Sequence, residues 1–185
     1  MKLAILLTVG LLLIAVTAVA EKAPYEYPAF NGSLDRQGGD TIATAVLIPT
    51  IPFSGSGTTV GYTNNYDAVC PYTGSLSPDV VYSIVPCLTG ALDITLCAGS
   101  NYDTKLYVMD SAQNVIACND DLCPGYVSEL TAANGTAVSV TAGALYYIVV
   151  DGYSGASGNY TIDITGMDCT TAAEESSFGT VKALY

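Results

Sequence analysis

The sequence contains no histidine and few basic residues. Five lysines and arginines stand against 17 aspartates and glutamates in 185 residues, for a formal net charge of −12. Without histidine, serine–histidine and cysteine–histidine catalysis within the chain are excluded, and so are the usual histidine metal triads. The excess of negative charge excludes nucleic acid and anionic membranes as partners, because both repel it.

The usual sequence signatures of an enzyme are also missing. The chain has no Gly-x-Ser-x-Gly elbow and no phosphate-binding glycine loop. Carboxylates are plentiful, so an acid-pair glycosidase remains open in principle, but nothing places a proton donor beside a nucleophile. We therefore expect a protein that does not catalyse a reaction.

The first 20 residues are typical of a cleavable secretory signal. Met1-Lys2 is a short basic start, Leu3–Val19 is an almost unbroken apolar run, and small residues precede Glu21. This pattern predicts cleavage after Ala20, while a retained membrane anchor is the alternative, since the run is near the minimum for spanning. Cleavage leaves 165 residues, enough for one domain, and predicts a secreted protein at the cell surface or outside the cell.

Six cysteines in an exported chain predict three disulfides. A metal site is disfavoured because the one short spacing, between Cys118 and Cys123, does not recur. The spacing alone does not choose among the possible connectivities. Our predicted pairing joins Cys97 to Cys118 across neighbouring strands, Cys70 to Cys123, and Cys87 to Cys169.

From Asp40 onward the sequence has the two-residue period of β-strands. Leu92, Ile94 and Leu96 share one face. The run Ala144–Asp151 has a fully apolar middle, which predicts a central strand covered on both faces. About eight or nine strands, separated by turn residues at roughly ten-residue spacing, predict an all-β fold, an antiparallel, jelly-roll-like β-sandwich stapled by disulfides. The stretch 41–48 is expected to be the first strand.

The mature chain divides into an extended N-terminal arm (21–39), the sandwich (40–166) and a C-terminal tail (167–185). The aromatic residues of the arm either pack on their own domain or pair with another subunit. The tail is either a frayed or edge-strand terminus or a segment that docks on a partner. The aromatic residues of the arm are Tyr25, Tyr27 and Phe30.

The densest carboxylate cluster flanks one predicted hairpin. Asp103 precedes a strand and the run Asn119-Asp120-Asp121 follows its partner, with the turn at 110–114 between them. Pairing of the two strands would bring Asp103, Asp120 and Asp121 together at one sheet edge, where hard oxygen ligands suit calcium. Glu129 could complete the shell. The alternative is that Asp103 and Asn119 cap turns while the other side chains are solvated.

Other polar and aromatic residues allow further contacts. Asn31, Asn134 and Asn159 begin glycosylation sequons, which are used only in a host with the machinery. Several tyrosines in predicted loops either stack on sugars or protein surfaces or form the rim of the core. These tyrosines are Tyr62, Tyr66, Tyr72, Tyr126 and Tyr153.

Six segments of the chain resemble a bacterial pre-peptidase C-terminal domain. They are 77–83 (SPDVVYS), 92–97 (LDITLC), 102–108 (YDTKLYV), 117–121 (ACNDD), and 143–152 (GALYYIVVDG) with 158–162. The similarity covers about Gly39 to Thr165. It implies a jelly-roll-like sandwich that serves as an accessory module for binding or secretion, sometimes with calcium, and not as the catalytic unit. No protease domain precedes the module in this sequence, so we expect a stand-alone role.

We therefore predict a secreted, non-catalytic binding or adhesion module of the cell surface or extracellular matrix. Its expected partner is an extracellular protein or carbohydrate, with calcium as the possible cofactor. The alternative is a structural subunit of an extracellular filament, a homo-polymer in which a terminal arm completes a neighbour's sheet by strand addition.

Overall fold

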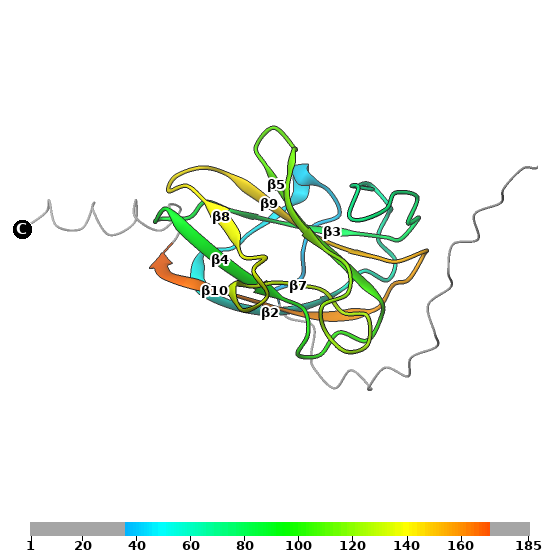
Figure 1. The fold of residues 1–185 in the computed structure, drawn as a ribbon. Coiled ribbons are helices and arrows are strands. Elements are labelled where there is room, and N and C mark those ends of the chain that lie inside the picture. The colour runs from blue at the N-terminus through cyan, green and yellow to red at the C-terminus, as the bar shows by residue number, and fades with distance from the viewer. Residues whose placement is uncertain (1–35, 171–185) are drawn as a thin grey trace, which may run out of the picture.

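The structure is a computed structural model that describes residues 36–170, with side chains to residue 168 (Figure 1). The predicted signal peptide, the arm as far as residue 35 with Asn31, and the tail from residue 171 lie outside the described residues. In the part described, no helix is long and apolar enough to cross a membrane.

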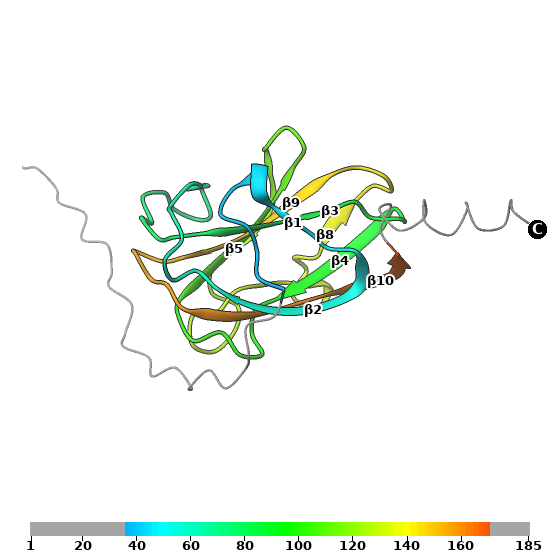
Figure 2. The same cartoon turned by 180° about the vertical axis from the view of Figure 1, so that it is seen from behind.

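The chain folds into two β-sheets packed face to face (Figures 1 and 2). All paired strands are antiparallel except β1 and β3. The first sheet has the order β1 (Val46–Leu47), β3 (Val80–Ile84), β9 (Tyr146–Gly152), β5 (Thr104–Asp110), β6 (Val115–Asn119). The second has the order β2 (Thr50–Thr58), β10 (Asn159–Thr170), β4 (Gly90–Thr95), β7 (Glu129–Leu130), with β8 (Val138–Val140) also paired to β4.

This architecture confirms the predicted all-β sandwich. The described residues contain ten strands where eight or nine were expected, and two of them, β1 and β7, are only two residues long. The last strand, β10, runs on to Thr170, past the predicted end of the sandwich at residue 166.

The alternation in the sequence places the core between the sheets. Leu92 and Ile94 of β4 are buried there, while Asp93 and Thr95, which alternate with them, are half-buried on the other face. Each such buried aliphatic side chain contributes about 1.5–3 kcal/mol to folding. The expectation for β9 is also confirmed, because β9 lies in the middle of its sheet with apolar side chains buried on both faces.

The outer face of β9 is covered by a long loop, residues 59–79, which we call the cover loop. Tyr66 and Ala68 of this loop pack on a second apolar cluster on the far side of the first sheet, with Val149 of β9 among its members. Asp79 Oδ2 accepts hydrogen bonds from the backbone N–H groups of Asn65 and Tyr66 at 2.8 and 2.9 Å. The loop is therefore an ordered layer over the sheet.

The predicted first strand, 41–48, is wrong at its start. A 3-10 helix, η1 (Ile42–Thr44), occupies that position, and only Val46–Leu47 form β1. The Thr41 N–H donates to Thr44 Oγ1 at 3.0 Å, and side-chain bonds of this kind compete with a strand ladder. Gly39 allows the turn to close, because a Cβ there would lie 1.9 Å from the Thr44 carbonyl oxygen.

Two of the predicted disulfides are wrong. The structure pairs Cys70 with Cys118 and Cys97 with Cys123, not Cys97 with Cys118 or Cys70 with Cys123. Cys97 follows β4 of the second sheet, whereas Cys118 is on β6 of the first, so they are not on neighbouring strands. Cys118 packs with the outer cluster, where the cover loop supplies Cys70. Cys87 is also disulfide-bonded, but its predicted partner, Cys169, lies beyond the described side chains.

Candidate functional site

The hairpin of β5 and β6 positions the predicted aspartates. Asp110 organises its turn, because Oδ1 accepts hydrogen bonds from the N–H groups of Ala112 and Asn114, each at 2.9 Å. The Asn114 side chain donates to Oδ2 at 3.0 Å, and these bonds lower the pKa of Asp110. The strands then pair along their length, with Leu106 opposite Asn119.

Asp103, Asp120 and Asp121 meet at one end of this hairpin. Each offers a carboxylate oxygen that lies within 4.8 Å of the others. Asp103 and Asp120 are half-buried and Asp121 is exposed. Three carboxylates at this separation fit part of a calcium shell, which takes six to eight oxygens.

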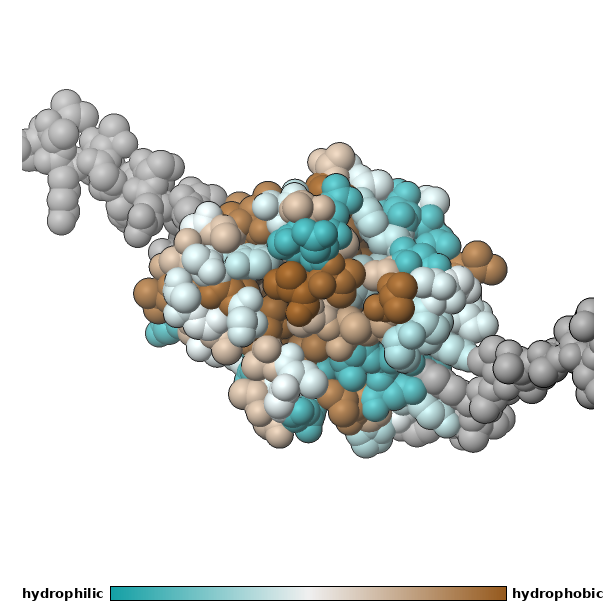
Figure 3. Space-filling model, turned by 45° about the horizontal axis from the view of Figure 1, so that its top comes forward, coloured by the Kyte–Doolittle hydropathy of each residue, from teal (hydrophilic) through white to brown (hydrophobic). Residues whose placement is uncertain are grey.

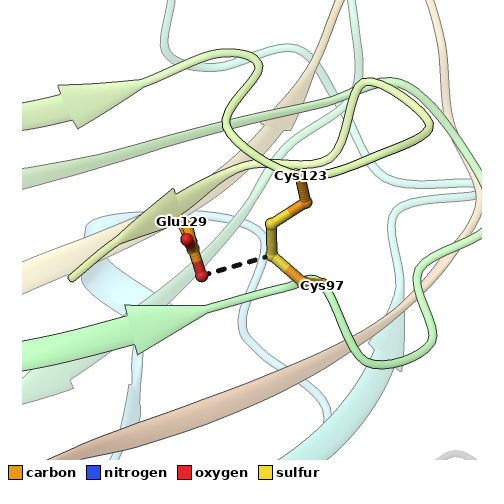
Figure 4. A group of neighbouring side chains, drawn as sticks. All are labelled: Cys97, Cys123 and Glu129. Carbon is orange, nitrogen blue, oxygen red and sulfur yellow. Dashed lines mark hydrogen bonds between the residues drawn. A yellow bond between two sulfur atoms is a disulfide. The ribbon is translucent and has the colours of Figure 1, made fainter. Parts of the chain in front are cut away.

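Glu129, expected as a fourth ligand, lies in another group of side chains (Figure 4). One of its carboxylate oxygens is 3.5 Å from Cys97 Sγ of the Cys97–Cys123 disulfide. The other accepts a hydrogen bond from the Asn134 side chain. Asn119 Oδ1 accepts from the backbone N–H of Glu129 at 3.0 Å, so Asn119 connects β6 to β7 and does not cap a turn of its own strand.

Two tyrosines lie beside the three aspartates. The rings of Tyr72 and Tyr153 meet edge to face with centroids 5.1 Å apart. The N–H of Tyr153 donates to the Asp103 carbonyl at 3.1 Å. Burial raises the pKa of Tyr72, and the negative charges of Asp120 and Asp103 raise it further. We call Asp103, Asp120, Asp121, Tyr72 and Tyr153 the acid–tyrosine end.

The other tyrosines singled out from the sequence are placed differently. Tyr62 packs against the main core and Tyr66 against the outer cluster. Tyr126 is half-buried, with a left-handed backbone at φ 59°.

The two sequons within the described residues differ in exposure. Asn134 is exposed at the end of the 3-10 helix η2 (Ala132–Asn134), whereas Asn159 is half-buried as the first residue of β10.

A second polar group, not predicted from the sequence, lies under the cover loop. Lys105 of β5 is fully buried, and its Nζ is 3.8 Å from Oδ2 of Asp151, which is also fully buried on β9. The same Nζ is 3.5 Å from Asp67 Oδ1 and donates to the Tyr72 carbonyl at 3.2 Å. Strand alternation by itself would turn Lys105 toward solvent. The cover loop buries Lys105 instead, and no pattern of neighbouring residues predicts the contact between the loop and this side chain.

Burial has a marked effect on two acids on this side of the sheet. It raises the pKa of Asp151 to about 8, although the Gly152 N–H and Lys105 counteract it. It also raises the pKa of Asp79 to about 6, against the hydrogen bonds from Tyr66 and Asn65. These carboxyl groups hold a proton at a pH where exposed aspartates have lost theirs.

Comparison with known proteins leaves the family open. No family model and no curated protein matches the chain. Among solved structures, a periplasmic inhibitor of g-type lysozyme from Aeromonas hydrophila matches with 12% identity and a TM-score of 0.38, over 65% of this chain and 93% of that chain. A likeness this distant carries no argument about function, and the resemblance to pre-peptidase C-terminal domains stays a prediction.

Proposed function

We propose that the chain is a secreted, non-catalytic binding module that engages an extracellular protein or carbohydrate through its acid–tyrosine end. The observation that carries this proposal is the meeting of three carboxylates within 4.8 Å of one another. They come from the start of β5 and the end of β6, and the cover loop and the end of β9 add a tyrosine each. Loops that converge on a rigid sheet end are where sandwich domains place binding residues.

Calcium is the cofactor that we propose for this end. Asp103, Asp120 and Asp121 would hold the ion, which offsets the repulsion among their charges and offers open coordination positions to a partner's oxygen atoms. Half-buried Asp103 and Asp120 give the site some rigidity, while exposed Asp121 leaves it open to the outside.

Calorimetric titration of calcium chloride into chelator-treated protein tests the proposal. We expect measurable heat, a rise in melting temperature, and roughly tenfold or greater weakening in Asp121→Asn, because the site loses one charged ligand. Asp163→Asn is the matched control, since this half-buried aspartate lies on β10 of the other sheet. No heat and no shift in melting temperature at millimolar calcium would exclude the ion.

Binding itself is measured on arrays of glycans and of extracellular matrix proteins, with calcium and with chelator. Retention that depends on calcium and is lost in Asp121→Asn identifies the partner class. Absence of retention on both arrays would count against the binding role.

A second candidate function, a filament subunit, is favoured by the open edge of the first sheet. In the part of the chain that the structure describes, β6 pairs with β5 alone. Its Val115 and Ile116 are 40% and 43% exposed. One face of the molecule carries a patch of hydrophobic side chains among hydrophilic ones (Figure 3). An exposed edge of this kind accepts an added strand.

The described end of the N-terminal arm packs on its own domain. Gly39 and Val81 exchange two backbone hydrogen bonds at 2.9 and 2.7 Å. Sedimentation and electron microscopy of the mature protein test assembly, with Ile116→Lys as the variant that charges the β6 edge. Monodisperse monomers at high concentration would exclude the filament.

A further inference from the structure

The amine of Lys105 and the carboxyl group of Asp151 face each other in a closed site. The two residues are directly opposite in the register of β5 and β9, so their side chains leave the sheet on the same face. Both are fully buried beneath the cover loop. The rings of Tyr72 and Tyr107 flank the amine, with centroids 4.8 and 5.7 Å from Nζ.

The two oxygens of Asp151 have different surroundings. Oδ1 accepts a hydrogen bond from the Gly152 N–H at 2.7 Å and lies 3.4 Å from the Ser75 hydroxyl. Oδ2 lies 3.8 Å from Lys105 Nζ and, among the described residues, has no hydrogen-bond partner. Oδ1 is therefore placed as a polarised carbonyl oxygen, and Oδ2 as the hydroxyl oxygen of a neutral acid. Burial, which raises the pKa of Asp151 to about 8, favours that neutral form.

A base lies on the other side of the amine. Asp67 Oδ1 is 3.5 Å from Lys105 Nζ, and the Asp67 side chain is 31% exposed. Burial tends to raise the pKa of Asp67, but the N–H groups of Gly74 and Ser75 together with Lys105 outweigh it and lower the pKa. Asp67 is therefore ionised, and its place between the amine and solvent lets it pass a proton from the ammonium group to water.

We propose that Lys105 and Asp151 condense to form an intramolecular isopeptide bond that joins β5 to β9. Asp67 takes one proton from the Lys105 ammonium group, and the freed lone pair of Nζ attacks Cγ of the neutral Asp151 carboxyl group. The electron pair of the Cγ–Oδ1 double bond moves onto Oδ1, where the Gly152 N–H and the Ser75 hydroxyl stabilise the negative charge.

Collapse of this intermediate re-forms the Cγ–Oδ1 double bond and breaks the Cγ–Oδ2 bond. Oδ2 leaves as water, with its own proton and one proton from the attacking nitrogen. The amide keeps the last proton of Nζ, and the proton taken first passes from Asp67 to solvent. The step needs no oxidant, reductant or further reactant. Exclusion of water by the cover loop favours the amide over its hydrolysis.

The mass of the secreted protein tests the bond directly. After reduction and denaturation, which remove any contribution from the disulfides, we expect an intact mass lower than the sequence mass by one water molecule. Digestion should release a branched peptide that joins the segments around Lys105 and Asp151. A protein with its full sequence mass would overturn the proposal.

A succinimide at Asp151-Gly152 would also lose one water, so the lysine amine is measured separately. Amine labelling of the denatured mature chain should modify Lys22 and Lys182 but not Lys105. A dehydrated protein in which Lys105 still reacts would overturn the isopeptide bond in favour of the succinimide.

Three variants test the roles of individual residues in the condensation. Lys105→Arg keeps the positive charge but cannot condense in this way, so its measured mass should equal the full mass of its own sequence. Asp163→Asn is the control, because Asp163 lies on β10, far from Lys105 and Asp151, and its measured mass should still be lower by one water molecule. Asp67→Asn keeps the size of the side chain without its basicity, so we expect much less of the condensed form. Complete condensation in Asp67→Asn would show that Asp67 is not the base.

Discussion

The hydroxyl groups of Tyr82 and Tyr160 lie 2.8 Å apart inside the sandwich. Tyr82 belongs to β3 of the first sheet and Tyr160 to β10 of the second, so one hydrogen bond joins the two sheets across the core. Tyr82 Oη also donates to the Arg36 carbonyl at 2.9 Å, and the Gly38 N–H donates to Tyr160 Oη at 3.4 Å. The pair therefore also attaches the chain before η1 to the core.

Removal of one of these hydroxyls should lower the stability of the folded protein. Tyr160→Phe leaves the buried Gly38 N–H without its acceptor and takes one partner from Tyr82, so we expect a loss of about 1–3 kcal/mol in the free energy of unfolding. Urea denaturation measures it. Tyr147→Phe, at a half-buried position over the outer cluster, is the control and should change stability by less. Equal effects of the two variants would show that the bond between the sheets contributes little.

The raised pKa of Asp79 predicts a fall in stability with pH. The folded state holds the Asp79 proton up to about pH 6, whereas the unfolded chain releases it near pH 4. The folded state is therefore favoured below that window and loses about 2–3 kcal/mol as the pH rises through it. The lowered pKa values of Asp67 and Asp110 act in the opposite sense, but below about pH 4.

Asp79→Asn should remove this fall, because the neutral amide carries no charge to bury. Urea denaturation at several values between pH 4 and pH 7 measures the difference between variant and native protein. The advantage of the variant should grow with pH up to about pH 6 and then level off. Parallel curves for the two proteins would contradict the burial of a protonated Asp79.

The two described disulfides should differ in how much they stabilise the fold and in whether they fix the cover loop. Cys70–Cys118 spans 48 residues and Cys97–Cys123 spans 26, so replacing each pair by serine should cost about 4 and about 3.5 kcal/mol. Only the loss of Cys70–Cys118 should free the cover loop. Hydrogen exchange should show faster exchange in residues 59–79 in that variant and not in the other. Unchanged protection of the loop would mean that its polar contacts suffice.

In a host with the glycosylation machinery, we expect a glycan at Asn134 and none at Asn159. Asn134 is exposed at the end of η2, while Asn159 pairs with Thr58 in the β2–β10 ladder. Mass spectrometry before and after glycosidase treatment, with Asn134→Gln as control, checks this expectation. A glycan on Asn159 would contradict the pairing of that strand end.

Much of the fold could be predicted because the patterns that specify it involve residues close to one another in the sequence. Alternation in 92–96 placed Leu92 and Ile94 in the core, and the apolar run 144–151 identified the central strand β9. The meeting of Asp103 with Asp120 and Asp121 followed from the turn at 110–114, since a hairpin brings the ends of its two strands together.

The residues that sequence reasoning misplaced are those decided by contacts between distant segments. By itself the sequence determined an acidic, histidine-free chain of alternating strands, because composition and period are properties of neighbouring residues. Only the tertiary structure decided that Cys70 pairs with Cys118 and that Lys105 is buried against Asp151. Both depend on where the cover loop lies, and a strand pattern describes two faces without saying what covers the outer one.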